Sequence, residues 1–130
     1  MNGFYRTSIS VLICKTNSIL NLGILSALSG KGITLYQTVT TDIGQLLKEE
    51  EIYHPNVVIL SQESMIVQHP HYCQLLTRNS AVRVLTVCAA SNHVCIDQDR
   101  VAVIHKASDI IDLIVDDTAL TIDWIQKGDL

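Results

Sequence analysis

Three apolar runs of this chain end in polar side chains that could hold an anion or attack a substrate. Ser61 ends one run, Lys15 and Thr16 follow a second, and Lys106 follows a third. A serine hydroxyl is a poor nucleophile unless an adjacent base activates it, and the sequence offers no base–nucleophile motif. Two lysine ammonium groups repel a divalent cation and attract an anion. We therefore do not expect these residues to form an enzyme active site.

Imidazole and thiol groups are concentrated in two further segments, residues 69–73 and residues 88–95. Zinc is usually held by four such ligands in a tetrahedral array. The His-x-His-x-Cys pattern of the first segment lacks the spacing of a zinc finger or zinc ribbon. Cys88 lies in an apolar run typical of a strand, where a free cysteine behaves as a small hydrophobe. The sequence therefore predicts two polar loops and one buried thiol, with no metal site and no cofactor.

The composition limits the class of protein. The 130 residues fit one domain, and the 48% hydrophobic but only 5% aromatic content predicts an aliphatic core. A net charge of −4 argues against direct nucleic-acid binding, because phosphate recognition needs clustered Lys and Arg. No apolar run approaches the ~18 residues of a membrane span, and the first residues lack a signal-peptide pattern. With four cysteines, of which Cys14 and Cys88 lie in apolar runs, we expect a cytoplasmic protein with reduced thiols.

The elements that must position these residues alternate along the chain, which predicts an α/β fold with a parallel sheet. Five strands are expected, over residues 9–14, 33–37, 55–61, 82–88 and 101–105. Helices are expected over residues 19–28, after Asp42, within residues 62–79 and from Ser108. Residues 89–100 lack a clear apolar period, so we expect a loop or a one-turn helix there.

The helix after Asp42 has the clearest local signals. Asp42 followed by Gln45 resembles a capping pair. Ile43, Leu46 and Leu47 form an apolar stripe at helical spacing, which predicts the buried face of the helix. The charged run at residues 48–51 is interpreted as the solvated end of the same helix.

This order of elements resembles the receiver domain of response regulators, with Pro55 and Asn56 before the third strand and residues 106–108 before the last helix. The resemblance extends from about Ser8 to Val115. It implies a three-layer, flavodoxin-like sandwich around a five-stranded parallel sheet of order 2-1-3-4-5. It also implies a site at the carboxyl ends of the strands.

The same resemblance implies that the receiver chemistry is lost. In receivers, an acidic pair follows the first strand and an acceptor aspartate ends the third, and the matching positions here are Lys15 and Thr16 for the pair and Ser61 for the acceptor. The hydroxyl residue of the family matches Cys88, and its aromatic switch residue matches Val103. Its lysine matches Lys106, the one position that is retained. Magnesium requires oxygen ligands, and the matched acidic positions carry none of the family's carboxylates. The resemblance therefore implies a degenerate pocket that is neither phosphorylated nor loaded with metal.

The function implied is that of a regulatory domain, residues 1–116, with residues 117–130 as an extension or linker. It would act through a protein partner or a homodimer in bacterial two-component or transcriptional regulation, with a DNA-binding output domain outside this chain. The fourth helix of the family is shortened or absent, so the face that receivers use to dimerise should be altered. Two alternatives stay open. One is a sensor of a small anion or other ligand at the strand carboxyl ends, and the other is an active phosphorelay receiver with displaced acidic residues.

Overall fold

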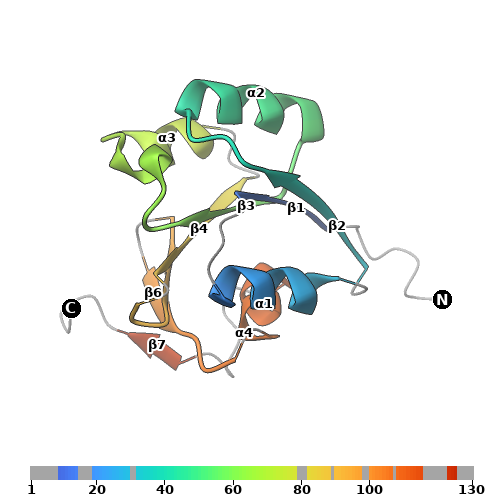
Figure 1. Cartoon of the computed structure of the whole chain (residues 1–130), viewed down its shortest axis with the longest axis vertical. Coiled ribbons are helices and arrows are strands. Elements are labelled where there is room, and N and C mark those ends of the chain that lie inside the picture. Colours follow the sequence, from blue (N-terminus) through green and yellow to red (C-terminus); the bar gives the residue numbers. More distant parts are fainter. Residues whose placement is uncertain are drawn as a thin grey trace.

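The strands of this protein form one mixed sheet with helices on both faces (Figure 1). The computed structural model describes residues 9–14, 19–29, 32–78, 82–88, 90–97, 100–106, 108–115 and 123–125. Within these residues the sheet has seven strands, in the order β2-β1-β3-β4-β5-β6-β7. Their bounds are Ile9–Cys14 for β1, Ile33–Thr38 for β2, Val57–Ser61 for β3, Arg83–Cys88 for β4, His93–Ile96 for β5, Arg100–Val103 for β6 and Asp123–Ile125 for β7.

The sheet is parallel in one half and antiparallel in the other. β2, β1, β3 and β4 pair in parallel, so the α/β class and the order of the first four predicted strands are confirmed. β5, β6 and β7 each pair antiparallel with the strand before them. The prediction of a purely parallel five-stranded sheet is therefore wrong, because β5 lies between β4 and the strand that was expected beside it.

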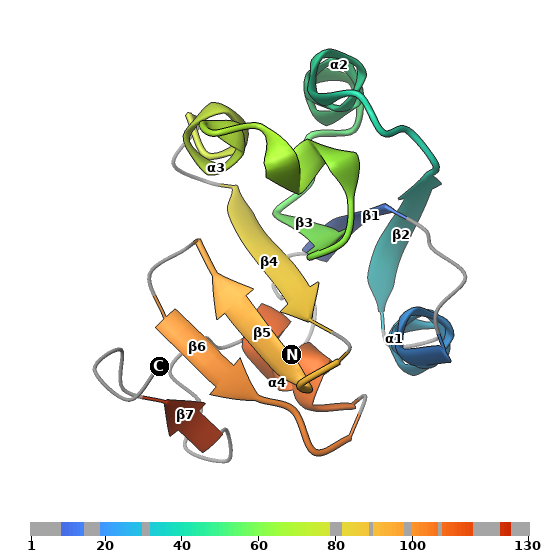
Figure 2. The same cartoon turned by 60° about the vertical axis from the view of Figure 1, so that its left-hand side comes forward.

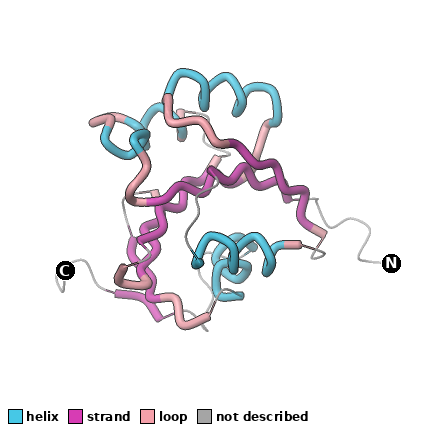
Figure 3. Tube along the Cα trace, viewed as in Figure 1, coloured by secondary structure: helices cyan, strands magenta, loops and turns pink. Residues whose placement is uncertain are grey.

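The helices complete a three-layer arrangement (Figure 3). Helices α1 (Ile19–Leu28) and α4 (Ser108–Val115) cover one face, and α2 (Ile43–Tyr53), α3 (Tyr72–Leu76) and the 3-10 helix η2 (Met65–Gln68) cover the other. Side chains alternate between the two faces along a strand. In β1, Val11 and Ile13 join the core under α1 and α4, whereas Leu12 joins the core under α2 and α3. A strand buried on both faces explains its continuous apolar run.

The connection between β4 and β6 contains β5 and not the loop or one-turn helix expected over residues 89–100. Asn92 (φ 56°) and Asp97 (φ 52°) flank β5 in the left-handed conformation, which asparagine and aspartate tolerate better than most residues. The Asp97 carboxylate accepts a hydrogen bond from the Val84 N–H at 2.7 Å. This bond fixes the end of β5 beside the start of β4.

Helix α2 begins as predicted and differs from the prediction near its end. The Asp42 carboxylate accepts a hydrogen bond from the Gln45 N–H at 3.1 Å, which confirms the cap. The run at residues 48–51 is not wholly solvated, because Glu50 is buried. Glu50 follows Leu46 by four residues, so it lies on the same buried face of the helix. Within the described residues, none of the helices has the length and apolar character that crossing a bilayer requires.

Candidate functional site

The predicted pocket lies at the carboxyl ends of the parallel strands, where the structure describes only some of its residues. Ser61 ends β3 and is half-buried. Its hydroxyl oxygen accepts a hydrogen bond from the Glu63 N–H at 3.2 Å, and the Gln62 N–H donates to the Val87 carbonyl at 2.8 Å. Ser61 therefore stabilises the turn that follows its strand. Lys15 and Thr16, predicted to share this pocket, lie outside the described residues.

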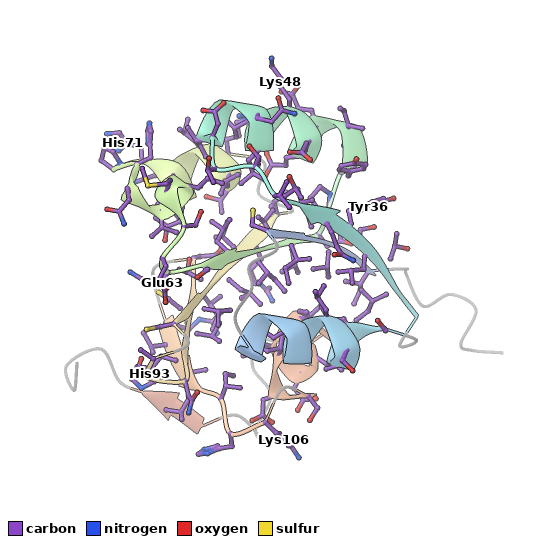
Figure 4. The ribbon with its side chains drawn as sticks, in the orientation of Figure 1. Tyr36, Lys48, Glu63, His71, His93 and Lys106 are labelled. Carbon is purple, nitrogen blue, oxygen red and sulfur yellow. The ribbon has the colours of Figure 1, made fainter. Side chains whose placement is uncertain are left out.

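Strand β5 separates the remaining predicted positions. His93 pairs with Cys88 of β4 on one side and with Val103 of β6 on the other. Two strands thus lie between β3 and β6. At ~4.8 Å a step, this order puts the ends of β3 and β6 roughly 14 Å apart. Figure 4 shows Glu63, which follows Ser61 closely in the chain, well away from Lys106.

Lys106 follows β6 in a turn that a buried carboxylate holds. Asp109, which is 6% exposed, accepts hydrogen bonds from the His105 N–H at 2.9 Å and the Lys106 N–H at 3.3 Å. The Asp109 N–H donates back to the Lys106 carbonyl at 3.0 Å. The backbone of Lys106 is therefore fixed, while its side chain is exposed.

None of the four cysteines, all of which the structure describes, forms a disulfide, and they lie in two environments. Burial, with a smaller contribution from the charge of Glu49, raises the pKa of the Cys14 thiol to about 12. Burial also raises the pKa of Cys73 to about 11, with Asp97 and Cys95 adding to the shift. Cys88 is half-buried and accepts a hydrogen bond from the Ser91 hydroxyl at 3.2 Å, so the prediction of a buried thiol at this position is wrong. No group of three metal-binding side chains occurs among the described residues.

A sheet face without a described helix lies beside α3. In the register of β4, β5 and β6, this face carries Cys88, His93, Cys95, Val101 and Val103, which we call the outer face. Val94, Ile96 and Ala102 alternate with these residues and are buried on the opposite side, in the core with α4. All five members of the outer face are half-buried. Figure 2 shows β5 and β6 in front, with α4 behind them.

The structure also shows a pocket at the opposite, amino-terminal edge of the sheet. Its volume is about 330 Å³, and it lies where α2 leads into β3 and α3 leads into β4. The lining residues are Glu50, Glu51, His54, Pro55, Asn56, Arg78 and Val82. No pattern in the sequence predicted this pocket.

Asn56, which lines this pocket, is fixed by hydrogen bonds of its backbone and of its side chain. Asn56 joins three strands: its N–H donates to the Ser10 carbonyl at 2.8 Å, its side-chain oxygen accepts from the Ser10 N–H at 2.8 Å, and its carbonyl accepts from the Arg83 N–H at 2.9 Å. His54 ends α2 with a left-handed backbone (φ 50°) and donates its N–H to the Glu50 carbonyl. The Asn56 that follows Pro55 thus has a structural role at the start of β3.

Glu50 is the chemically unusual residue of the pocket. It is 5% exposed, and its Oε2 atom makes no hydrogen bond with any described group. Burial raises the pKa of this carboxyl to about 7, although the nearby Arg78 acts in the lowering direction and Glu51 adds to the rise. Arg78 itself pairs with Glu51 at 2.9 Å at the solvent-exposed rim. Glu50 therefore changes charge near neutral pH inside a pocket.

Comparison with known proteins finds no matching family model, no matching curated protein and no matching solved structure.

One signal in the sequence could have indicated the pocket. Glu50 continues the apolar stripe of α2 at Leu46 by one helical turn, a position that points toward the sheet. A helix-wheel argument therefore places this carboxylate on the buried face, although its charged neighbours suggest a solvated end. The pairing of α2 with the segment around Arg78 is a tertiary feature that the local sequence does not contain.

Proposed function

We propose that this chain is a receiver-like regulatory domain that acts in the cytoplasm through protein–protein contact, without phosphorylation or catalysis. The observation that carries the proposal is the chemistry of the carboxyl edge. At the position that the resemblance matches to the acceptor, the Ser61 hydroxyl stabilises a turn. Of the described acids near this edge, Glu63 is exposed and Glu49 accepts a hydrogen bond from Thr38. Two carboxylates engaged or placed in this way are a poor substitute for the oxygen ligands that magnesium requires.

The arrangement of the strands supports the receiver-like assignment. The parallel strands have the order β2-β1-β3-β4, which is how the first four strands of a flavodoxin-like sheet are arranged. A regulatory setting in bacterial two-component signalling or transcription follows from the resemblance of the sequence. In this proposal, a DNA-binding output domain would be a separate partner.

Incubation of the purified chain with Mg²⁺ and acetyl phosphate tests the loss of phosphorylation. We expect the intact mass to be unchanged, because no acceptor aspartate lies at the end of β3. A stoichiometric phosphoryl adduct would contradict the proposal and would favour a receiver with displaced acidic residues.

We further propose that the outer face is the contact surface and that its occupant is a second copy of the chain. A twofold contact brings the same patch of each protomer together, so the patch must be self-complementary. The five residues of the outer face include no Asp, Glu, Lys or Arg, and Val101 and Val103 supply apolar area beside His93 and Cys95. Asp123 of β7 pairs with Val103 at the edge of this face. Two such faces can meet through the five uncharged residues, with Asp123 at the edge of the contact.

Sedimentation velocity over a concentration series tests this contact. We expect a dimer for the wild-type chain and a monomer for Val103→Asp, with Val101→Lys as a second variant on the same face. Val39→Asp is the matched control, because Val39 is 79% exposed on the far side of the parallel half of the sheet, and it should leave the dimer intact. A wild-type chain that stays monomeric, or a Val103→Asp chain that stays dimeric, would overturn the proposed contact.

A further inference from the structure

The amino-edge pocket combines a cavity, a buried acid and a rim that is already paired. Glu50 comes from α2, Arg78 from the segment after α3, and His54, Pro55 and Asn56 from the connection into β3. The cavity of about 330 Å³ is near the lower end of the ~300–1,000 Å³ range of small-molecule sites. It therefore suits a small ligand.

The charge of the pocket indicates which ligand it would recognise. The ionisable groups that face Glu50 are Arg78 and Glu51, and His54 also lines the cavity. Arg78 Nη2 and Glu51 Oε1 lie 2.9 Å apart and neutralise each other at the rim. When Glu50 is ionised, the pocket holds one uncompensated negative charge in a buried position.

The Oε2 atom of Glu50 also lacks a hydrogen-bond donor. It is buried and makes no hydrogen bond with any described group, and buried polar groups in folded proteins are nearly always satisfied. A ligand with an N–H donor and a positive charge would satisfy the atom and balance the charge. An anion would meet the Glu50 carboxylate and would have to displace Glu51 from Arg78.

We propose that this pocket binds a small organic cation with N–H donors, a primary ammonium or a guanidinium, and that the Glu50 carboxylate is its counter-ion. Such a ligand fits Glu50 better than a metal ion does, because calcium and magnesium need about six oxygen ligands. Among the described residues, no group of side chains suits a metal. The inference does not depend on the proposed dimer, since the pocket and the outer face lie at different parts of the sheet.

The site has a pH dependence with a defined sign. The cation binds the ionised carboxylate, and burial raises the pKa of Glu50 to about 7. Binding below this pH must release a proton, so the apparent affinity should rise by up to about tenfold per pH unit and level off above pH ~7–8. Arg78 competes with the ligand for the same carboxylate, whereas Glu51 holds Arg78 at the rim.

Titration of the full chain with butylguanidinium tests the proposal, with chemical shifts of the backbone amides as the readout at pH 6, 7 and 8. We expect saturable shifts around α2 and the connection into β3, with affinity that increases over this pH range. Pentanoate and pentanol, which have a similar size but carry a negative charge or none, should bind at least tenfold more weakly. Tighter binding of pentanoate would overturn the proposal.

Two variants separate a cation site from an anion site. Glu50→Gln keeps the shape of the side chain and should weaken butylguanidinium binding at pH 8 by at least tenfold. Arg78→Gln removes the competing guanidinium and should strengthen it, whereas an anion site would lose affinity. Glu63→Gln removes a carboxylate at the opposite edge and should leave the affinity within twofold. Equal affinity of the wild type and a folded Glu50→Gln chain, judged by the dispersion of the same spectra, would overturn the assignment of Glu50.

Discussion

Among the described residues, each edge of the sheet buries one carboxylate, and the surroundings of the two groups differ. At the carboxyl edge, Asp109 accepts hydrogen bonds from the N–H groups of His105 and Lys106. At the amino edge, Glu50 is equally buried, but its Oε2 atom makes no hydrogen bond with any described group. A satisfied buried carboxylate stabilises a turn, whereas an unsatisfied one raises the free energy of the folded state. The comparison assigns a structural role to Asp109 and a binding role to Glu50.

The edges also differ in how they combine residues from separate elements. The insertion of β5 spreads the polar residues of the carboxyl edge along the sheet. Ser61 ends β3 and Lys106 follows β6, and these two strands are not neighbours. At the amino edge, β3 and β4 are adjacent, and the segments that lead into them bring Glu50 and Arg78 to one pocket. Adjacency of strands, and not the residue types alone, decides where a site can form.

The largest expected effect concerns the thiols of the carboxyl edge, Cys14 at the end of β1 and Cys88 at the end of β4. The pKa of Cys14 is raised to about 12 from an ordinary value of 9.0. Since only the thiolate reacts, its thiolate fraction at pH 8 should be about a thousandfold lower than that of an ordinary thiol. We expect iodoacetamide to modify half-buried Cys88 at least ~100-fold faster than Cys14.

Peptide mapping of a labelling time course measures both rates in one sample. In urea both thiols are exposed, and their rates should converge. Equal rates in the folded chain would mean that Cys14 is accessible, and the carboxyl edge would then be more open than the structure indicates.

The second prediction concerns the stability cost of ionising Glu50. In the folded chain the Glu50 carboxyl holds its proton more tightly, with a pKa of about 7 against an ordinary value of 4.5. The contribution of the protonated Glu50 carboxyl to the free energy of unfolding is therefore fully present below pH ~4.5. It is lost as the pH rises through 7, and the loss is about 3 kcal/mol at most. Glu50→Gln should be more stable than the wild type by about 1–3 kcal/mol at pH 8 and about equal to it at pH ~4.5.

Urea denaturation followed by circular dichroism at the two pH values tests this difference. Glu63→Gln is the control, because Glu63 is exposed at the other edge, and it should change the free energy of unfolding by less than ~0.5 kcal/mol at both pH values. If Glu50→Gln lowers stability at pH 8, the wild-type carboxylate has a partner, and the comparison between the two edges fails.

Much of the fold could be predicted from the sequence because its signals are local. The continuous apolar runs of β1 and β3 fit strands that are buried on both faces, and the Asp42 cap fixes the start of α2. β5 was missed because it is short, with four residues, and because its antiparallel pairing depends on turns at Asn92 and Asp97. The pattern of Val94 and Ile96 alternating with polar residues is the signal that would have indicated it.

The candidate site was less predictable than the fold. The resemblance to receivers directs attention to the carboxyl edge, where Ser61, Cys88 and Lys106 lie on separate strands or beyond them. The pocket at the other edge depends on Arg78, which is 27 residues from its ion-pair partner Glu51. No local pattern encodes a contact of that kind, so the charged run of α2 could only be interpreted as solvated.

The third prediction tests the structural role of Asp109. Asp109→Ala leaves two backbone N–H groups near α4 without their acceptor, which should lower the free energy of unfolding by about 2 kcal/mol. Asp109→Asn keeps one acceptor oxygen and should cost about half as much. Urea denaturation at pH 7 measures both. If the alanine variant is no less stable than the asparagine variant, the hydrogen bonds of Asp109 do not stabilise the turn that holds Lys106.

The smallest expected effect is at the rim of the amino-edge pocket. Arg78 and Glu51 are 42% and 69% exposed at their side chains, so their ion pair should contribute less than ~1 kcal/mol, and less still at high salt. A double-mutant cycle with Glu51→Gln and Arg78→Gln measures this coupling. A coupling well above 1 kcal/mol would mean that solvent screens the pair less than its exposure indicates. A weak coupling fits a rim in solvent, where Arg78 competes only weakly with a cation for the buried Glu50 carboxylate.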